Sequence, residues 1–192
     1  MNLNSDISLP LRPERVHEVC GAGAVSFAAV AAARVSTLLW VREAWQTEAI
    51  NPVGLSAFFD PSKLLLAKTR NQIETLSVAE EALKDGAVEL VVIEISRPLN
   101  LREGRRLQLA AQAGQTTGLC LIPEGMGSNA AETRWLCTPV FDAGDSTRMR
   151  WEIIKNKSGT LGAWHVRWNA ETRRLDMVSP AGKRPGSEGA PG

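Results

Sequence analysis

The stretch HEVCGAGAVSFAAVAAA, residues 17–33, decides the fold. A short apolar segment ends at Cys20, glycines follow at Gly21 and Gly23, and small apolar residues then predict a helix. A strand that turns through glycines into a helix is typical of phosphate-binding loops. A working loop of this kind also supplies a lysine, and residues 21–36 contain none. The stretch therefore indicates either a degenerate nucleotide site or a tight turn, and the tight turn is favoured because a lone Gly-x-Gly is unspecific.

Strands and helices alternate outward from this stretch. The run VELVVIEI, residues 88–95, is apolar almost throughout, which is typical of a strand covered on both faces. Residues 53–59 are ambiguous and favour a short helix. Strands are predicted at residues 16–20, 37–41, 63–68, 88–95 and 117–122, and helices at 24–34, 71–84 and 101–113. This alternation predicts an α/β fold with a mostly parallel sheet flanked by helices.

The last third of the chain has a different rhythm. After a loop at residues 123–131, short strands follow one another without helices, which predicts antiparallel pairing. These strands are expected at residues 133–141, 148–155, 163–169 and 174–178. We divide the chain into an N-terminal arm at 1–15, one α/β domain at 16–179 and a tail at 180–192, which is too rich in Pro and Gly to fold.

Composition excludes several classes of protein. The 192 residues carry a net charge of +1, so the chain as a whole gives no polyelectrolyte signal for nucleic acid. The three cysteines are widely spaced, which argues against disulfides and zinc and favours buried strand positions. No apolar run is long enough to cross a membrane, and the first ten residues are too polar for a signal peptide. We expect a cytoplasmic protein with no metal.

These motifs in order resemble the core of RecA-type recombinases, and more narrowly the ImuA proteins of bacterial SOS mutagenesis cassettes. The resemblance spans residues 16–178. GAVELVVIEIS, residues 86–96, resembles the Walker B strand and places Glu94 at its acidic position. LWVREAW, residues 39–45, is similar to the strand before the catalytic glutamate and places Glu43 there. TRMRWEIIKNKSG, residues 147–159, resembles the stretch whose two lysines, here Lys155 and Lys157, face a neighbouring subunit's nucleotide.

The departures from this pattern weaken the nucleotide site. The phosphate-binding lysine is absent, so only Gly21, Gly23, Ser26, Glu43 and Glu94 remain as a degenerate cofactor-binding set. Two carboxylates at neighbouring strand ends could hold a metal ion and activate water. Without a lysine to neutralise phosphate charge, they fit better as polar residues of the sheet. We therefore expect no catalytic residues, no enzymatic activity and no bound cofactor.

Basic and aromatic residues form the remaining candidates, for contact with DNA or a protein. Each basic cluster can also be an ordinary solvated face paired with nearby glutamates. Trp164 and Trp168 lie on the last hairpin and could form an exposed aromatic face for a partner. The basic candidates are Arg102, Arg105 and Arg106 on a helix, Arg148, Arg150, Lys155 and Lys157 on a strand, and Arg167, Arg173 and Arg174 around the last hairpin.

The resemblance implies a non-catalytic RecA-like accessory protein of SOS mutagenesis and translesion DNA synthesis. It would recruit an ImuB-like homologue of the Y-family polymerases and act with an error-prone replicative-type polymerase. RecA is a further candidate partner, and DNA binding would be weak. The alternatives are a RecA-like ATPase with a degenerate phosphate loop and a cell-division inhibitor of the SulA type. The sequence leaves self-association open.

Overall fold

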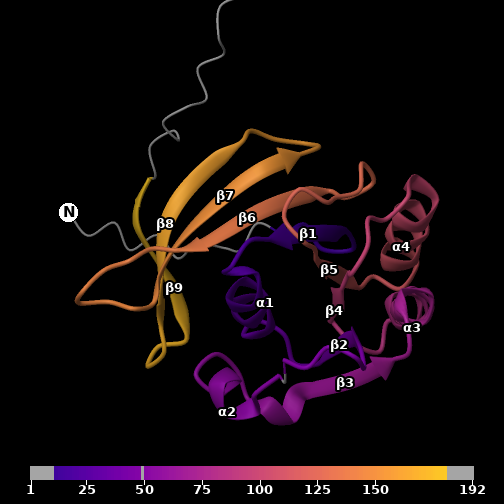
Figure 1. Cartoon of the computed structure of the whole chain (residues 1–192), viewed down its shortest axis with the longest axis horizontal. Helices are drawn as coiled ribbons and strands as arrows, with labels where there is room; N and C mark the ends of the chain where they lie inside the picture. The colour runs from indigo at the N-terminus through magenta and orange to yellow at the C-terminus, as the bar shows by residue number, and fades with distance from the viewer. Residues whose placement is uncertain (1–10, 49, 181–192) are drawn as a thin grey trace, which may run out of the picture.

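A nine-stranded sheet forms the frame of the protein, whose computed structural model describes residues 11–48 and 50–180 (Figure 1). The strands are β1 (Val16–Cys20), β2 (Leu38–Glu43), β3 (Leu64–Thr69), β4 (Leu90–Glu94), β5 (Thr117–Leu121), β6 (Thr133–Pro139), β7 (Arg148–Asn156), β8 (Gly162–Asn169) and β9 (Arg174–Pro180). Their order is β3-β2-β4-β5-β1-β6-β7-β8-β9. The predicted α/β fold is confirmed. Along this order, all neighbouring strands from β3 through β1 to β6 pair in parallel, and the strands from β6 to β9 pair antiparallel.

Local sequence signals set the helix ends. The helices are α1 (Ala24–Ala32), α2 (Pro52–Leu55), α3 (Gln72–Asp85) and α4 (Leu101–Ala113), with a 3-10 turn, η1, at Pro61–Lys63. The Asn71 side chain caps α3, and Gly86 ends it at φ 78°. Asn100 and Glu103 form a capping box at the start of α4. The ambiguous residues 53–59 begin with the last three residues of a short helix, α2. The Asn51 side chain caps the start of this helix.

Two apolar cores lie on opposite faces of the sheet. Side chains alternate along each strand, so Trp40 of β2 joins one core and Val41 joins the other. The first core surrounds α1, and the second lies under α3 and α4. In Figure 1 the antiparallel strands curve around α1, so this helix lies inside the sheet's concave side. Phe27 of α1 is fully buried there, with ring centroids 5.3 Å from Trp135 and 4.5 Å from Trp151.

Several predicted element bounds shift by a few residues. The strand predicted at 37–41 runs to Glu43, and the one predicted at 63–68 begins only after η1. The predicted strand 88–95 spans only Leu90–Glu94, and the helix predicted at 24–34 ends at Ala32. Turn residues flank each of these elements, and patterns of apolar residues fix element ends poorly.

The predicted arm and tail fall mostly on residues 1–10 and 181–192, outside the described residues, so the division into arm, domain and tail stays a prediction. Cys20, Cys120 and Cys137 are buried in β1, β5 and β6, as expected of small apolar strand residues. Within residues 11–48 and 50–180, no helix is long and apolar enough to cross a membrane.

Candidate functional site

The turn from β1 into α1 packs directly on β6. The Gly23 amide donates a hydrogen bond to the Cys137 carbonyl at 2.8 Å, and Ala24 donates to Gly21 at 3.0 Å. Gly21 has a φ of 90°, and a Cβ there would lie 2.4 Å from the Cys137 oxygen. A Cβ at Gly23 would lie 3.1 Å from the same oxygen. Both glycines thus allow a close backbone approach to β6, and the Gly23 amide is already engaged.

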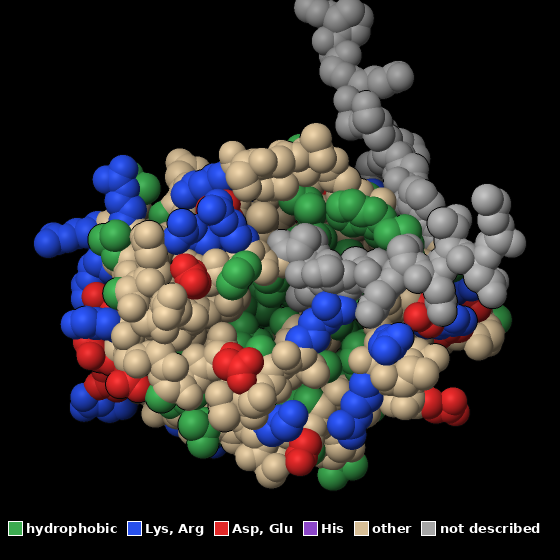
Figure 2. Space-filling view, turned by 180° about the vertical axis from the view of Figure 1, so that it is seen from behind, with side chains coloured by type: hydrophobic (Ala, Val, Ile, Leu, Met, Phe, Trp, Pro, Cys, Tyr) green, Lys and Arg blue, Asp and Glu red, His purple; other side chains and the backbone are tan. Residues whose placement is uncertain are grey.

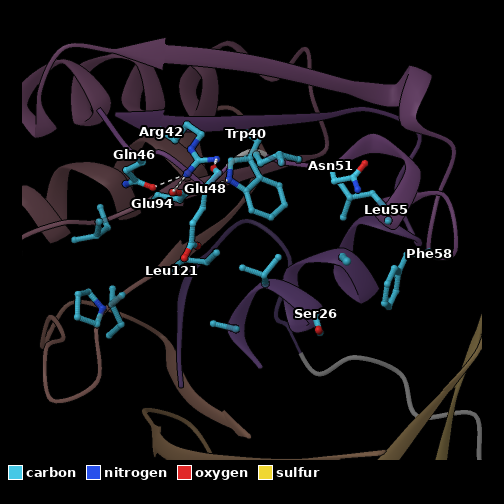
Figure 3. A pocket seen from close by; sticks show the side chains of 18 residues that line it. Ser26, Trp40, Arg42, Gln46, Glu48, Asn51, Leu55, Phe58, Glu94 and Leu121 are labelled. Carbon is cyan, nitrogen blue, oxygen red and sulfur yellow. Dashed lines mark hydrogen bonds and ion pairs between the residues drawn. The ribbon is translucent and has the colours of Figure 1, made fainter. Parts of the chain in front are cut away.

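A cavity of about 520 Å³ opens beside this turn, over the carboxyl ends of β2, β4 and β5 (Figure 3). Ligands of open parallel sheets bind at this end of the strands. Ser26 of α1 lines the cavity on one side, and Leu55 and Phe58 line it near α2. Its walls are largely apolar, and its charged lining residues are Arg42, Glu48 and Glu94.

A buried ion pair lies in the wall of this cavity. The Arg42 guanidinium is 3.4 Å from a Glu94 carboxylate oxygen, and the Trp40 indole N–H donates to the other oxygen at 2.7 Å. Arg42 also donates to the Gln46 side chain and to the Glu48 carbonyl. Burial raises the pKa of Glu94, while the Trp40 hydrogen bond and Arg42 oppose that rise. The carboxylate that the sequence resemblance places at the Walker B position is therefore paired with a cation of its own chain.

Glu43 lies on the other face of the sheet. Its carboxylate accepts hydrogen bonds from the Ser96 hydroxyl and, at 2.6 Å, from the Trp45 indole. Ser96 in turn bonds to Gln72 of α3. Because Glu43 follows Arg42 on β2, its side chain points away from the face that carries Arg42 and Glu94. The two carboxylates of the predicted nucleotide set do not converge on one site.

Lys155 and Lys157 fasten the loop that follows β5. The Lys155 ammonium donates to the carbonyls of Ser128, Asn129 and Ala131, at 3.2, 3.0 and 2.6 Å. Lys157 donates to the Ala130 carbonyl at 2.6 Å. Burial lowers the pKa of Lys155, and nearby Lys157 lowers it further. Both ammonium groups thus bind the chain's own backbone.

Four arginines of the predicted basic clusters are paired with carboxylates. Arg106 of α4 pairs with Glu80 of α3, and Arg150 pairs with Glu152. Figure 2 shows basic and acidic side chains side by side at the edge of the molecule, with no broad basic field on that face. Among the described residues, Arg102, Arg105, Arg173 and Arg174 make no ion pair. The paired members of the other clusters are Arg148, with Asp142 and Asp145, and Arg167, with Asp145 and Asp176.

The predicted exposed aromatic face is wrong for Trp168. This side chain is 6% exposed, its ring stacks on Phe58, and its indole N–H donates to the Ala57 carbonyl at 2.9 Å. Trp164 is half-buried, and its ring centroid lies 6.1 Å from that of Trp135. Both tryptophans lie on the concave side of β8, where the meander meets the first core. Alternation along an antiparallel strand predicts two faces, but it does not say which face is covered.

Sequence reasoning missed Arg42 and Glu48. Val41 pairs with Ile93 across β2 and β4, which places the next residues, Arg42 and Glu94, side by side. The signal was a lone arginine two residues after Trp40 on the same strand face. Its meaning depended on the strand register, which the sequence did not supply.

The described part of the chain has the fold of RecA-type recombinases. The crystal structure of the RadB recombinase superposes with a TM-score of 0.65 at 13% sequence identity, covering 88% of this chain and 93% of that one. No family model matches the sequence. The protein ImuA of Caulobacter vibrioides, in strains NA1000 and CB 15, is 30% identical over 183 residues, covering 86% of this chain and 72% of the relative. The chain belongs to the ImuA family.

Proposed function

We propose that this protein is a non-catalytic RecA-like accessory factor of SOS-induced mutagenesis and translesion DNA synthesis, acting in the cytoplasm. The observation that carries the proposal is the turn at Gly21 and Gly23, whose amide at Gly23 is bonded to Cys137 of β6. Phosphate-binding turns work by pointing free amides at the anion. An amide bonded to a carbonyl of its own chain is lost to that purpose.

Charge in the adjoining cavity also disfavours a nucleotide. Arg42 is the cation of the lining, and its charge is offset by Glu94, while Glu48 adds a second carboxylate. Polyphosphates require lysine and metal ions to offset their charge. An excess of negative charge beside apolar walls repels such a ligand. This argues against the alternative of a RecA-like ATPase, and the separation of Glu43 from Glu94 argues against it as well.

A protein without catalysis would act through its surfaces. We propose that it recruits an ImuB-type homologue of the Y-family polymerases and, with it, an error-prone replicative-type polymerase. RecA is a further candidate partner. In the region of residues 148–174, side chains available to a partner include Ile154 and Leu161, which are 40% and 64% exposed, and half-buried Trp164. Membership of the ImuA family supports this role over that of a SulA-type division inhibitor.

The test combines recruitment with a carboxylate substitution. The tagged chain is purified from DNA-damaged cells, as wild type and as Glu43→Gln and Glu94→Gln variants. At matched levels of folded protein, we expect all three to retain the ImuB-type protein and to support damage-induced mutagenesis equally, since neither carboxylate would act in catalysis. Loss of mutagenesis in both variants, with normal protein levels, would favour the ATPase. Failure of the wild type to retain the ImuB-type protein would refute recruitment.

A Leu161→Ser variant, in the turn between β7 and β8, tests the surface of residues 148–174. Leu109→Ser on α4 is a matched control. Leu109 is 67% exposed, close to the exposure of Leu161, so both substitutions remove similar apolar surface. We expect the Leu161→Ser variant to bind the ImuB-type protein more weakly and the Leu109→Ser variant to bind it normally. Equal binding by the two variants would exclude Leu161 from the interface.

A further inference from the structure

The cavity beside α1 retains the size of a ligand site but has the wrong charge for a nucleotide. Its volume of about 520 Å³ lies within the range of small-ligand pockets. Figure 3 shows the Trp40 ring, Leu55 and Phe58 along one side of it, with Glu48 reaching toward Leu121 on the other. A matching occupant presents an apolar group to these walls and a cation to the carboxylates.

Glu48 is the group that a cation would meet first. The side chain is exposed, and no ion pair engages it among residues 11–48 and 50–180. Arg42 binds the backbone carbonyl of Glu48, which anchors this residue while its carboxylate stays available. Glu94, the other carboxylate of the lining, is already paired with Arg42.

Apolar surface continues beyond the cavity, which favours a macromolecule over a small ligand. Val25 lines the mouth and is 53% exposed, and Val53, between the lining residues Asn51 and Gly54, is 79% exposed. Apolar residues that cluster around a cavity mark sites of protein interaction. A peptide segment covers such a rim while it inserts a side chain.

We propose that this cavity is a docking site for a segment of a partner protein that carries a large apolar side chain next to lysine or arginine. The apolar side chain enters between Leu55, Phe58 and Leu121, and the basic head meets Glu48. The proposal rests on the proposed recruiting role, and it assigns the cavity beside α1 to the binding of a partner. The same fold position then serves a protein ligand in place of a phosphate.

The test uses capped hexapeptides and the indole N–H signal of Trp40, assigned in a ¹H–¹⁵N spectrum with a Trp40→Phe variant. One peptide carries two leucines followed by two lysines; in the others, glutamates replace the lysines or serines replace the leucines. We expect the leucine–lysine peptide to shift the Trp40 signal and the other two to bind at least about fivefold more weakly. Mg·ATP is titrated alongside and is expected to leave the signal unmoved.

Two variants locate the site. Glu48→Lys should weaken the leucine–lysine peptide about two- to fivefold, the usual worth of an exposed ion pair, while Glu81→Lys on α3 should leave binding unchanged. Gly54→Phe should abolish binding, because Gly54 lines the cavity and the added ring would take up space there. The nearest atoms lie 3.9 Å from a Cβ built on Gly54, so the backbone has room for the new side chain. Equal affinity for the lysine and glutamate peptides, or an unmoved Trp40 signal, overturns the proposal.

The outcomes separate this site from the recruiting role. If the ImuB-type protein binds wild type, Glu48→Lys and Gly54→Phe equally well, the docking site is refuted and recruitment stands. If the peptide binds as expected but no ImuB-type protein is retained from damaged cells, recruitment of that partner is refuted and the site keeps its peptide specificity.

Discussion

Arg42 decides the chemistry of the cavity at the scale of single residues. It is 6% exposed, and its partners are a carboxylate, an amide oxygen and a backbone carbonyl. A buried guanidinium in this position satisfies Glu94 without any bound ion. The cost of burying both charges is offset only while the pair is intact.

We expect Arg42→Met to destabilise the protein by about 3 kcal/mol, because it leaves the Glu94 carboxylate buried without its cation. The double variant Arg42→Met with Glu94→Gln should recover much of that loss, since no uncompensated charge remains. Urea denaturation of the wild type, both single variants and the double variant gives the coupling free energy. Additive losses would show that the pair is not coupled.

His17 gives the protein a pH-dependent stability. Its ring nitrogens bond to the Thr133 hydroxyl at 2.7 Å and to the Arg12 carbonyl at 2.9 Å. Burial lowers the pKa of His17 from 6.5, although the bond to Arg12 and the charge of Glu132 oppose this. The unfolded chain takes up a proton near pH 6.5 and the folded chain does so only at lower pH, so acid favours unfolding.

The free energy of unfolding contributed by His17 should therefore be fully present above its unfolded pKa and decrease as pH falls from 6.5 toward the lowered folded pKa. Denaturation of the wild type and a His17→Gln variant at pH 7.5 and pH 5.5 measures this contribution. The wild type should lose more stability than the variant between the two values. An equal loss would mean that His17 does not couple folding to protons.

The turn at Gly21 is the decisive feature at the scale of elements. We expect Gly21→Ala to cost at least about 2 kcal/mol, because it combines a φ of 90° with a Cβ only 2.4 Å from the Cys137 oxygen. Gly144→Ala is the control, since the nearest atom to its built Cβ is the Asp142 oxygen at 3.5 Å. Thermal unfolding should separate the two variants clearly, and a Gly21→Ala protein as stable as Gly144→Ala would mean that the turn does not pack on β6.

Elements were easier to predict than their contacts. Apolar runs such as residues 88–95 predicted the central strands, and helical spacing with Gly86 predicted α3, because these signals are local. The position of Gly21 against Cys137 depends on residues 116 positions apart, which no local pattern contains. The same holds for Lys155, whose carbonyl partners at 128–131 follow from the pairing of β6 with β7.

At the scale of the whole molecule, charge pairing limits the DNA binding that we expect. Net charge is +1, and much of the predicted basic clusters is engaged in ion pairs or backbone contacts. We expect a dissociation constant for duplex DNA of about 10 µM or weaker near physiological salt. An Arg102→Ser, Arg105→Ser variant should flatten the salt dependence by about two phosphate contacts, while Arg70→Ser, which removes a paired arginine, should not. Submicromolar binding that persists at high salt would contradict this account.

At this scale the proposal is that the chain keeps the fold of a recombinase without its catalytic function. The parallel core and antiparallel meander belong to a fold that the RadB recombinase shares, and the resemblance in the sequence anticipated that fold. Glu94, which the sequence resemblance places at the Walker B position, keeps its carboxylate but is engaged by Arg42 and Trp40. The sequence shows that the phosphate-binding lysine is missing. Only the register of β2 against β4 shows that Arg42 lies beside Glu94 and offsets its charge.

Calorimetric titration of Mg·ATP into the wild-type protein tests the central claim most directly. The engaged Gly23 amide and the Arg42–Glu94 pair predict no saturable binding tighter than about 100 µM. Glu94→Gln should give the same flat titration, because this carboxylate would hold no metal ion. A low-micromolar dissociation constant for the wild type that weakens in Glu94→Gln would contradict the account and restore a working nucleotide site.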